Sequence, residues 1–160
     1  MYDTLYSAFV DALKREGKVI TTYTENTPCN VLFRRNSDLN KPTNTTTIFY
    51  PVDSPIRAGQ LLKFKNATYL SINQETAEND VYLKSDLRQT NATINYISQG
   101  IEQSIPVYAN DVNDALANSG SVLSLVSGNV LMLAEDNSLT RTLKLGTIFR
   151  SWAVGGRSRI

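Results

Sequence analysis

Residues 56–72 of this chain read IRAGQLLKFKNATYLSI, and this stretch decides the fold class. Apolar and polar residues alternate over 61–65 and again over 69–72, which is the period of a half-buried β-strand. Asn66-Ala67 lies between the two runs and is predicted to turn the chain. Gly59 precedes the first strand, where glycine permits a positive φ. The stretch therefore predicts two antiparallel strands joined by a tight turn.

Further short apolar runs, separated by polar segments, lie on both sides of this stretch. We predict strands at 19–23, 31–35, 46–52, 81–83, 94–97, 105–108, 121–126 and 129–134. Segments 36–45, 73–80 and 109–120 are rich in polar turn residues and predict loops, and Ser127-Gly128-Asn129 predicts a hairpin turn. The pattern is typical of a mainly β protein built from small antiparallel β-barrel or sandwich units.

The N-terminal segment has a different period. Leu5, Phe9 and Leu13 recur four residues apart and would share one face of a helix. Gly17 is suited to end that helix. We therefore predict a helix over 3–16. An isolated helix of this length is marginal in water, so its apolar face must be covered by the rest of the protein or by a neighbouring subunit.

These elements divide the chain into three parts. We predict an N-terminal helix over 1–17, a first β unit over 18–91, and a second β-rich unit over 92–160 with a flexible basic C-terminal tail. Residues 47–63 and 130–150 share an apolar strand, an acidic turn and the pattern [IL]-[KR]-[AL]-G-[QT]-[LI]-[LF]-[KR]. This similarity indicates either two related β units or the ordinary resemblance of any two strand–turn–strand segments.

The composition excludes most familiar catalytic and metal-binding chemistry. The chain has no His, the commonest general base and metal ligand. Its single cysteine, Cys29, allows no disulfide within the chain and no multi-thiolate metal site. Without a His to activate it, Cys29 is expected to be a buried structural thiol. We therefore expect no enzyme, no cofactor, and no catalytic, cofactor-binding or metal-binding residues.

The charged residues also argue against two classes of function, a protein that binds DNA by its overall charge and an enzyme that uses carboxylates. Lys and Arg number 16 and Asp and Glu 15, and this near balance does not favour a protein that holds DNA by bulk charge. The acidic residues cluster in predicted loops, so we interpret them as solvated turn acids; a carboxylate-driven hydrolase is the one enzyme class left. The clusters are Glu75 with Glu78 and Asp80, Asp111 with Asp114, and Glu135 with Asp136.

One group of residues indicates a different class of function. Lys63, Phe64, Lys65 and Tyr69 lie on adjacent predicted strands, and small β-barrels bind single-stranded nucleic acids with such interleaved basic and aromatic side chains. The same residues are equally consistent with an ordinary solvated strand face. No apolar stretch is long enough to span a membrane.

The helix followed by the 56–72 phrase resembles the small head–tail connector proteins of tailed bacteriophages, the head-completion or stopper proteins of the neck. The positions that carry the resemblance are Arg57, Gly59, Leu62, Phe64, Asn66, Tyr69 and Ile72. Gly146, Phe149 and Trp152 resemble the same phrase a second time. The second unit ends earlier than such proteins lead us to expect, which puts its identity in doubt.

The resemblance implies a virion structural protein, assembled in the host cytoplasm, that forms a homo-oligomeric ring in the neck. Such a ring joins the portal or adaptor proteins of the head to the tail, helps to retain packaged DNA and contacts that DNA only incidentally. The alternatives are another tail component, such as a tail terminator or distal tail protein, and a single-stranded nucleic-acid-binding β-barrel protein.

Overall fold

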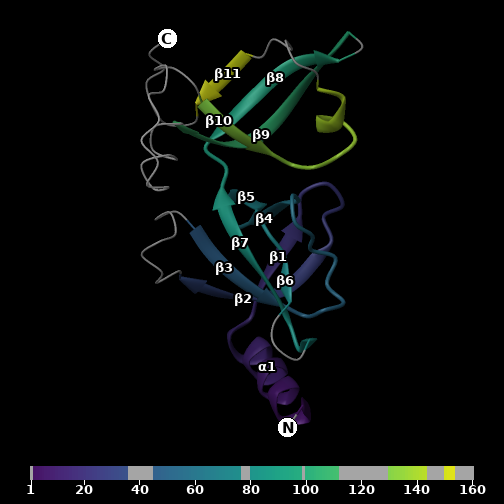
Figure 1. Cartoon of the computed structure of the whole chain (residues 1–160), viewed down its shortest axis with the longest axis vertical. Coiled ribbons are helices and arrows are strands. Elements are labelled where there is room, and N and C mark those ends of the chain that lie inside the picture. Colours follow the sequence, from purple (N-terminus) through teal and green to yellow (C-terminus); the bar gives the residue numbers. More distant parts are fainter. Residues whose placement is uncertain are drawn as a thin grey trace, which may run out of the picture. The chain divides into compact units, whose positions relative to one another are not determined.

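The computed structural model describes residues 2–35, 45–76, 80–98, 100–111, 130–143 and 150–153 of the 160-residue chain (Figure 1). The chain divides into two compact units, Met1–Gln89 and Thr90–Ile160. The first unit is a helix followed by a six-stranded antiparallel barrel, and the second contains a small antiparallel sheet. The predicted fold class, mainly β with one N-terminal helix, is therefore confirmed.

Helix α1 covers Tyr2–Glu16 and begins one residue before the predicted start. Phe9 and Leu13 from its second half are buried against Val81, and this small apolar cluster fixes the helix to the outside of the barrel. The helix ends where the N–H of Gly17 donates to the carbonyl oxygen of Leu13 at 2.9 Å. A Cβ at Gly17 would collide with that oxygen, so the close approach requires glycine.

Six strands of the first unit form a closed barrel. They are β1 (Lys18–Thr22), β2 (Pro28–Arg35), β3 (Thr45–Tyr50), β4 (Leu61–Phe64), β5 (Ala67–Ser71) and β7 (Leu83–Gln89). Each pairs antiparallel with the next in the order β1-β2-β3-β7-β5-β4, and β4 pairs back to β1. The short strand β6 (Glu75–Thr76) pairs with the start of β7.

The barrel interior is filled by alternate residues of these strands. Ile20, Val31, Ile48, Leu62 and Leu87 are fully buried and belong to one apolar cluster, as the period-two pattern requires. Partly buried aromatic residues pack against this cluster from the same strands; they include Phe33, Phe64 and Tyr69.

The hairpin between β4 and β5 turns one residue earlier than predicted. Phe64 pairs with Ala67, so the two-residue loop is Lys65-Asn66, and the prediction that Asn66-Ala67 forms the turn was wrong. Of these two loop residues only Lys65 has a positive φ, +53°. Gly59, just before β4, has a φ of +76°, as predicted.

The second unit contains a four-stranded antiparallel sheet in the order β10-β9-β8-β11. Its strands are β8 (Ala92–Ser98), β9 (Ile101–Asp111), β10 (Val130–Ala134) and β11 (Arg150–Ala153). Ile94, Tyr96, Ile105 and Val107 form the buried core on one face of β8 and β9.

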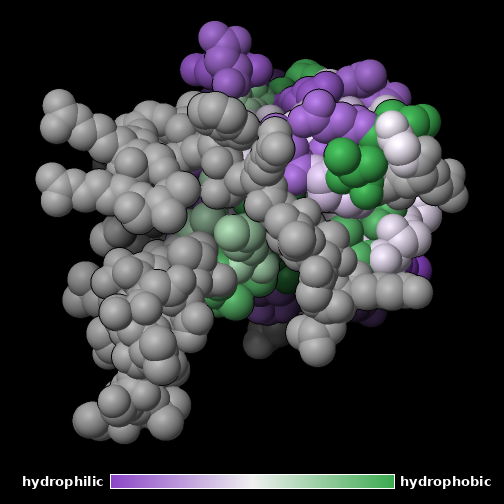
Figure 2. Space-filling view, turned by 90° about the horizontal axis from the view of Figure 1, so that it is seen from above, coloured by the Kyte–Doolittle hydropathy of each residue, from purple (hydrophilic) through white to green (hydrophobic). Residues whose placement is uncertain are grey.

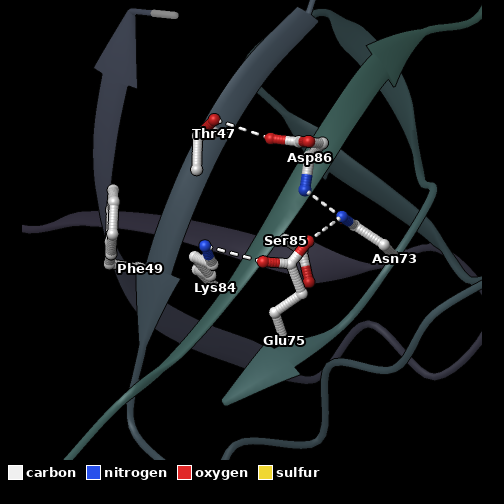
Figure 3. A pocket seen from close by; sticks show the side chains of 7 residues that line it. All are labelled: Thr47, Phe49, Asn73, Glu75, Lys84, Ser85 and Asp86. Carbon is white, nitrogen blue, oxygen red and sulfur yellow. Dashed lines mark hydrogen bonds and ion pairs between the residues drawn. The ribbon is translucent and has the colours of Figure 1, made fainter. Parts of the chain in front are cut away.

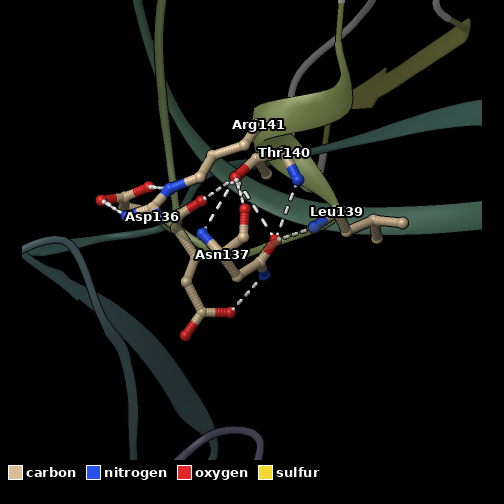
Figure 4. A network of polar contacts seen from close by, with 6 residues as sticks. Asp136, Asn137, Leu139, Thr140 and Arg141 are labelled. Atoms are coloured by element: carbon tan, nitrogen blue, oxygen red, sulfur yellow. Dashed lines mark hydrogen bonds and ion pairs between the residues drawn. The ribbon is translucent and has the colours of Figure 1, made fainter.

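A polar turn after β10, whose hydrogen bonds are drawn in Figure 4, contributes Leu139 and Leu143 to this core. The side-chain oxygen of Asn137 accepts the N–H groups of Leu139 at 3.0 Å and Thr140 at 2.9 Å. The Thr140 hydroxyl donates to the carbonyl oxygen of Glu135 at 2.6 Å. The short 3₁₀ helix η2 (Thr140–Thr142) begins within this network, which therefore sets the direction of the chain after β10.

Several predictions fall outside the described residues: the strand at 121–126, the turn at 127–129, most of the loops, the second glycine of the internal similarity and the basic tail. Among the described strands the first unit is a closed barrel and the second an open four-stranded sheet, so the two units do not share one topology. The boundary between the two units lies after Gln89, whereas the sequence pattern predicted it after Asn91. No described helix is long and apolar enough to cross a membrane.

Candidate interaction surfaces

A polar hollow of about 190 Å³ lies on the barrel beside β3 and β7 (Figure 3). Asn73 links its members, since Oδ1 accepts the N–H of Asp86 at 2.7 Å and Nδ2 donates to Glu75 at 2.8 Å. Glu75 also lies 2.6 Å from Nζ of Lys84, and the Thr47 hydroxyl donates to the Asp86 carboxylate at 2.7 Å. The three charged groups that line the hollow thus all have partners, and their contacts attach β6 to β7.

The Lys84 side chain of the hollow is held in its charged form. The hydrogen bond and negative charge of Glu75 raise the pKa of the Lys84 ammonium group above its ordinary value. A lysine with a raised pKa stays protonated at neutral pH, so its amine is not available as a nucleophile or a general base. Both partners are substantially exposed, so the ion pair adds little to the stability of the barrel.

A second hollow, of about 270 Å³, lies where helix α1 meets the loops at one end of the barrel. Tyr6, Pro51, Val52 and Val81 supply its apolar lining, and Asp53 and Asp80 its acidic part. None of these carboxylates is part of a cluster of metal ligands among the described residues. The hollow is therefore suited to an apolar side chain accompanied by a positive charge.

The first half of α1, which contributes Tyr6 to this hollow, leaves apolar side chains exposed. Leu5 is 46% exposed and Tyr6 55% exposed, although both belong to the apolar side of the helix. Val52, on the loop that lines the same hollow, is 51% exposed. The sequence predicts that the apolar side of α1 needs a covering surface, and within the described first unit only its second half, around Phe9 and Leu13, has one.

The described part of the second unit also exposes large apolar side chains. They lie on β8, β9 and β10 and are Ile97, Ile101, Leu131 and Met132. Figure 2 shows one face of the molecule, on which apolar residues in green lie at the surface beside polar ones in purple. Scattered apolar residues are ordinary on protein surfaces, so these four carry less weight than the hollow lined by Tyr6 and Val52.

The lysines and aromatic residues singled out in the sequence separate into two groups. Phe64 packs against Phe33 of β2 with ring centroids 4.5 Å apart. Nζ of Lys65 lies 5.5 Å from the Phe64 centroid, and Nζ of Lys18 lies 5.8 Å from the Phe33 centroid. We call Lys18, Phe33, Phe64 and Lys65 the lysine–aromatic cluster. Sequence reasoning missed Lys18 and Phe33, because only the pairing of β1 with β2 and β4 brings them to the 56–72 hairpin.

Lys63 belongs to the other group. Its Nζ lies 4.4 Å from the ring centroid of Tyr23 and 3.4 Å from the side-chain oxygen of Asn26. Tyr69 packs against the apolar core of the barrel. The predicted set of four residues is therefore not one surface, since only Phe64 and Lys65 remain together.

The acidic residues do not all behave as predicted. Glu75 and Asp80 are exposed, but Glu135 is buried and accepts a hydrogen bond from Asn137 Nδ2 at 2.9 Å, so its interpretation as a solvated acid was wrong. Two hydrogen bonds from Arg141, of 2.7 and 2.8 Å, lower the pKa of the exposed Asp136. The other predicted acids, Glu78, Asp111 and Asp114, have side chains outside the described part of the structure.

The position of Cys29 in the structure agrees with the prediction that it is a buried structural thiol. The side chain is buried in the barrel core, and burial raises the pKa of its thiol. A thiol with a raised pKa is a weak nucleophile at neutral pH. Cys29 therefore serves the packing of the barrel.

The residues that carry the resemblance to neck proteins occupy structural positions. Leu62 lies in the barrel core, Gly59 has a positive φ, and Asn66 is part of the β4–β5 turn. Arg57 and Ile72 are exposed at opposite ends of the phrase. These positions explain why the segment 56–72 forms a hairpin, and they do not converge on one site.

The comparisons with known proteins give one match. No curated protein and no solved structure matches the chain. The model of the YomX N-terminal domain matches residues 1–89, which are the residues of the first compact unit, helix α1 and the barrel. Because this match covers more than half of the chain, the chain belongs to the family of the YomX N-terminal domain, a phage-derived protein family.

Proposed function

We propose that this protein is a structural component of a tailed-phage particle, where it forms a homo-oligomeric ring in the neck between the head and the tail. Its phage-associated family gives the general setting. The proposed work is done by contacts between subunits and with neighbouring portal, adaptor and tail proteins. It requires no bond to be made or broken, no cofactor and no membrane.

The observation that carries the proposal is the half-covered helix. Leu5 and Tyr6 of α1 remain exposed, and Tyr6 and the exposed Val52 line the hollow of about 270 Å³ at the end of the barrel. A monomer has no reason to keep half of an amphipathic helix uncovered, because burying such a side chain contributes about 1.5–3 kcal/mol. A neighbouring subunit packed on this surface supplies the missing cover, and in a ring the contact would be heterologous, from one subunit to the next around the axis.

The test is genetic and structural. The chain should be found by mass spectrometry in phage particles purified on a density gradient, and electron microscopy should place it in a ring. Deleting its gene should give heads that lose their packaged DNA and complete tails that do not join to them. Its absence from purified particles would refute the proposal. Tails of abnormal length would instead identify a tail terminator, and loss of tail tips a distal tail protein.

A nucleic-acid-binding protein is the second candidate, and the lysine–aromatic cluster favours it. As the main function it is disfavoured by the near balance of charges, 16 basic against 15 acidic residues, because phosphate binding over a large surface needs a basic surplus. Titration of the purified protein with oligonucleotides at increasing salt separates the two candidates. Tight binding with a steep salt slope would favour the nucleic-acid-binding protein.

A further inference from the structure

We propose that the lysine–aromatic cluster is a local contact site for the phosphodiester backbone of DNA, a second role that does not depend on the neck ring. The cluster is continuous, since Lys18 lies over Phe33, Phe33 packs on Phe64, and Lys65 lies over Phe64. Both lysines are exposed and both rings are half-buried. Two ammonium groups are thus held on either side of one aromatic pair.

The charges around the cluster favour an anionic ligand. Strands β1, β2, β4 and β5, which supply or flank the cluster, contain no Asp or Glu. The nearest carboxylate in the sequence, Glu16, accepts a hydrogen bond from Arg15 at 3.1 Å. Glu75 and Asp86 are engaged in the polar hollow. The almost neutral total charge therefore hides a locally basic part of the barrel.

The backbone at Lys65 gives independent support. Lys65 is the first residue of a two-residue hairpin loop and has a φ of +53°, a conformation that glycine adopts at lower cost. A lysine held in an unfavourable conformation needs another reason to be there, and such strain is concentrated at functional sites. Here the turn conformation places the ammonium group of Lys65 beside the exposed part of Phe64.

The lysine and aromatic side chains of the cluster match the two components of DNA that they would contact, the phosphate and the base. Lysine ammonium groups bind phosphate oxygens as point charges, and an exposed aromatic face accepts an unpaired base by stacking. Each phosphate contact contributes about −0.7 to the slope of log K against log salt for a single strand and about −0.9 for a duplex. Two lysines therefore predict a weak, salt-sensitive interaction that does not select a sequence.

The test uses the full-length protein and fluorescence anisotropy with a labelled oligodeoxythymidine and a labelled duplex at low salt. The double variant Lys18→Gln/Lys65→Gln should weaken binding and reduce the magnitude of the salt slope by about 1.4 for the single strand or about 1.8 for the duplex. The matched control is Lys14→Gln/Arg15→Gln, which removes two positive charges from exposed positions on helix α1. This control should leave the slope nearly unchanged.

Two further variants separate folding from binding. Lys65→Gly should raise the melting temperature, because glycine relieves the positive φ, and yet weaken DNA binding. Phe64→Leu should weaken binding of the single strand more than binding of the duplex if a base stacks there. Equal effects of the cluster and control variants, or no binding by the unaltered protein at low salt, would overturn the proposal. Neither result bears on whether the chain is part of a neck ring.

Discussion

The hydroxyl oxygens of Tyr50 and Ser85 lie 2.6 Å apart inside the barrel, and neither side chain is more than 1% exposed. Tyr50 belongs to β3 and Ser85 to β7, two strands that are far apart in the sequence and whose pairing completes the barrel. A polar contact between buried groups at this junction specifies which strands meet, because an unpaired hydroxyl in the core is costly.

Replacing either hydroxyl should destabilise the barrel. Tyr50→Phe leaves the Ser85 hydroxyl without this partner, and Ser85→Ala does the same to Tyr50, so each should lower the free energy of unfolding by about 1–3 kcal/mol. The double variant should cost less than the sum, since it leaves neither group unpaired. Urea denaturation followed by circular dichroism measures all three, and strictly additive effects would show that the two hydroxyls do not interact.

Alkaline pH should destabilise the first unit through its buried acids. Burial raises the pKa of Tyr50 above its ordinary value of 10.0 and that of Cys29 above 9.0. The two protonated groups therefore contribute fully to the free energy of unfolding below their ordinary pKa values. This contribution is lost as the pH rises through the higher pKa values of the folded state. Unfolding free energies measured across this range should fall less steeply for Tyr50→Phe than for the unaltered protein, and an equal slope would contradict the expectation.

A negative charge on the exposed apolar part of α1 should prevent assembly without unfolding the protein. Leu5→Glu and Tyr6→Glu place a carboxylate where the proposed neighbour packs, and a single carboxylate costs several kcal/mol when it is buried without a partner. Ser7→Glu, on the solvated side of the same helix, is the matched control. Light scattering of the assembled material and the melting temperature report the two properties, and assembly by both apolar-site variants would argue against this surface as the interface.

Gly17→Ala should loosen helix α1. The added Cβ collides with the carbonyl oxygen of Leu13 and with the side-chain oxygen of Asn30, so the helix end must move, at a cost of about 1–3 kcal/mol. Hydrogen exchange should show faster exchange over the whole of α1. Gly100→Ala provides the comparison, because its Cβ meets nothing within 4 Å and its strain is confined to a turn of the second unit; unchanged protection of α1 in Gly17→Ala would contradict the expectation.

Asn137→Ala should destabilise the second unit alone. Its side-chain oxygen accepts the N–H groups of Leu139 and Thr140 and starts the turn that brings Leu139 to the core. Losing such a local cap costs about 0.5–2 kcal/mol. Native-state hydrogen exchange should show the loss in β8 and β9 and leave β3 and β7 as protected as before; an equal loss in both units would show that they unfold together.

The sequence was sufficient for the elements whose signals are local. The four-residue spacing of Leu5, Phe9 and Leu13 predicted α1 to within one residue, and the period-two pattern of 56–72 predicted β4 and β5. The turn between them was misplaced because asparagine is the usual residue at a positive φ, whereas here Lys65 adopts it. The length of strand β7 was also underestimated. Its buried face contains the polar Ser85 beside Leu87, and its other face carries Lys84 and Asp86, so the sequence shows no clear alternation of apolar and polar residues.

What the sequence did not reveal depends on contacts between distant strands. The lysine–aromatic cluster needs β2 and β4 to flank β1, and nothing in the local pattern of Phe33 or Lys18 predicts that arrangement. Burial of Glu135 likewise depends on the turn formed by Asn137, whose polar residues by themselves indicate a solvated loop. Pairing and register are set by the whole fold, and a single chain read residue by residue carries little information about them.

Strand β7 is the last barrel strand to leave the ribosome, and it is also the strand that pairs with β3, β5 and β6. Until it has emerged, β3 and β5 each keep one side without a partner, and the nascent chain cannot enclose its core. Once Gln89 is free the barrel can close, before the strands of the second unit have emerged. The first half of this protein is thus arranged to mature during synthesis, and a fragment that stops short of β7 should be captured by chaperones and degraded.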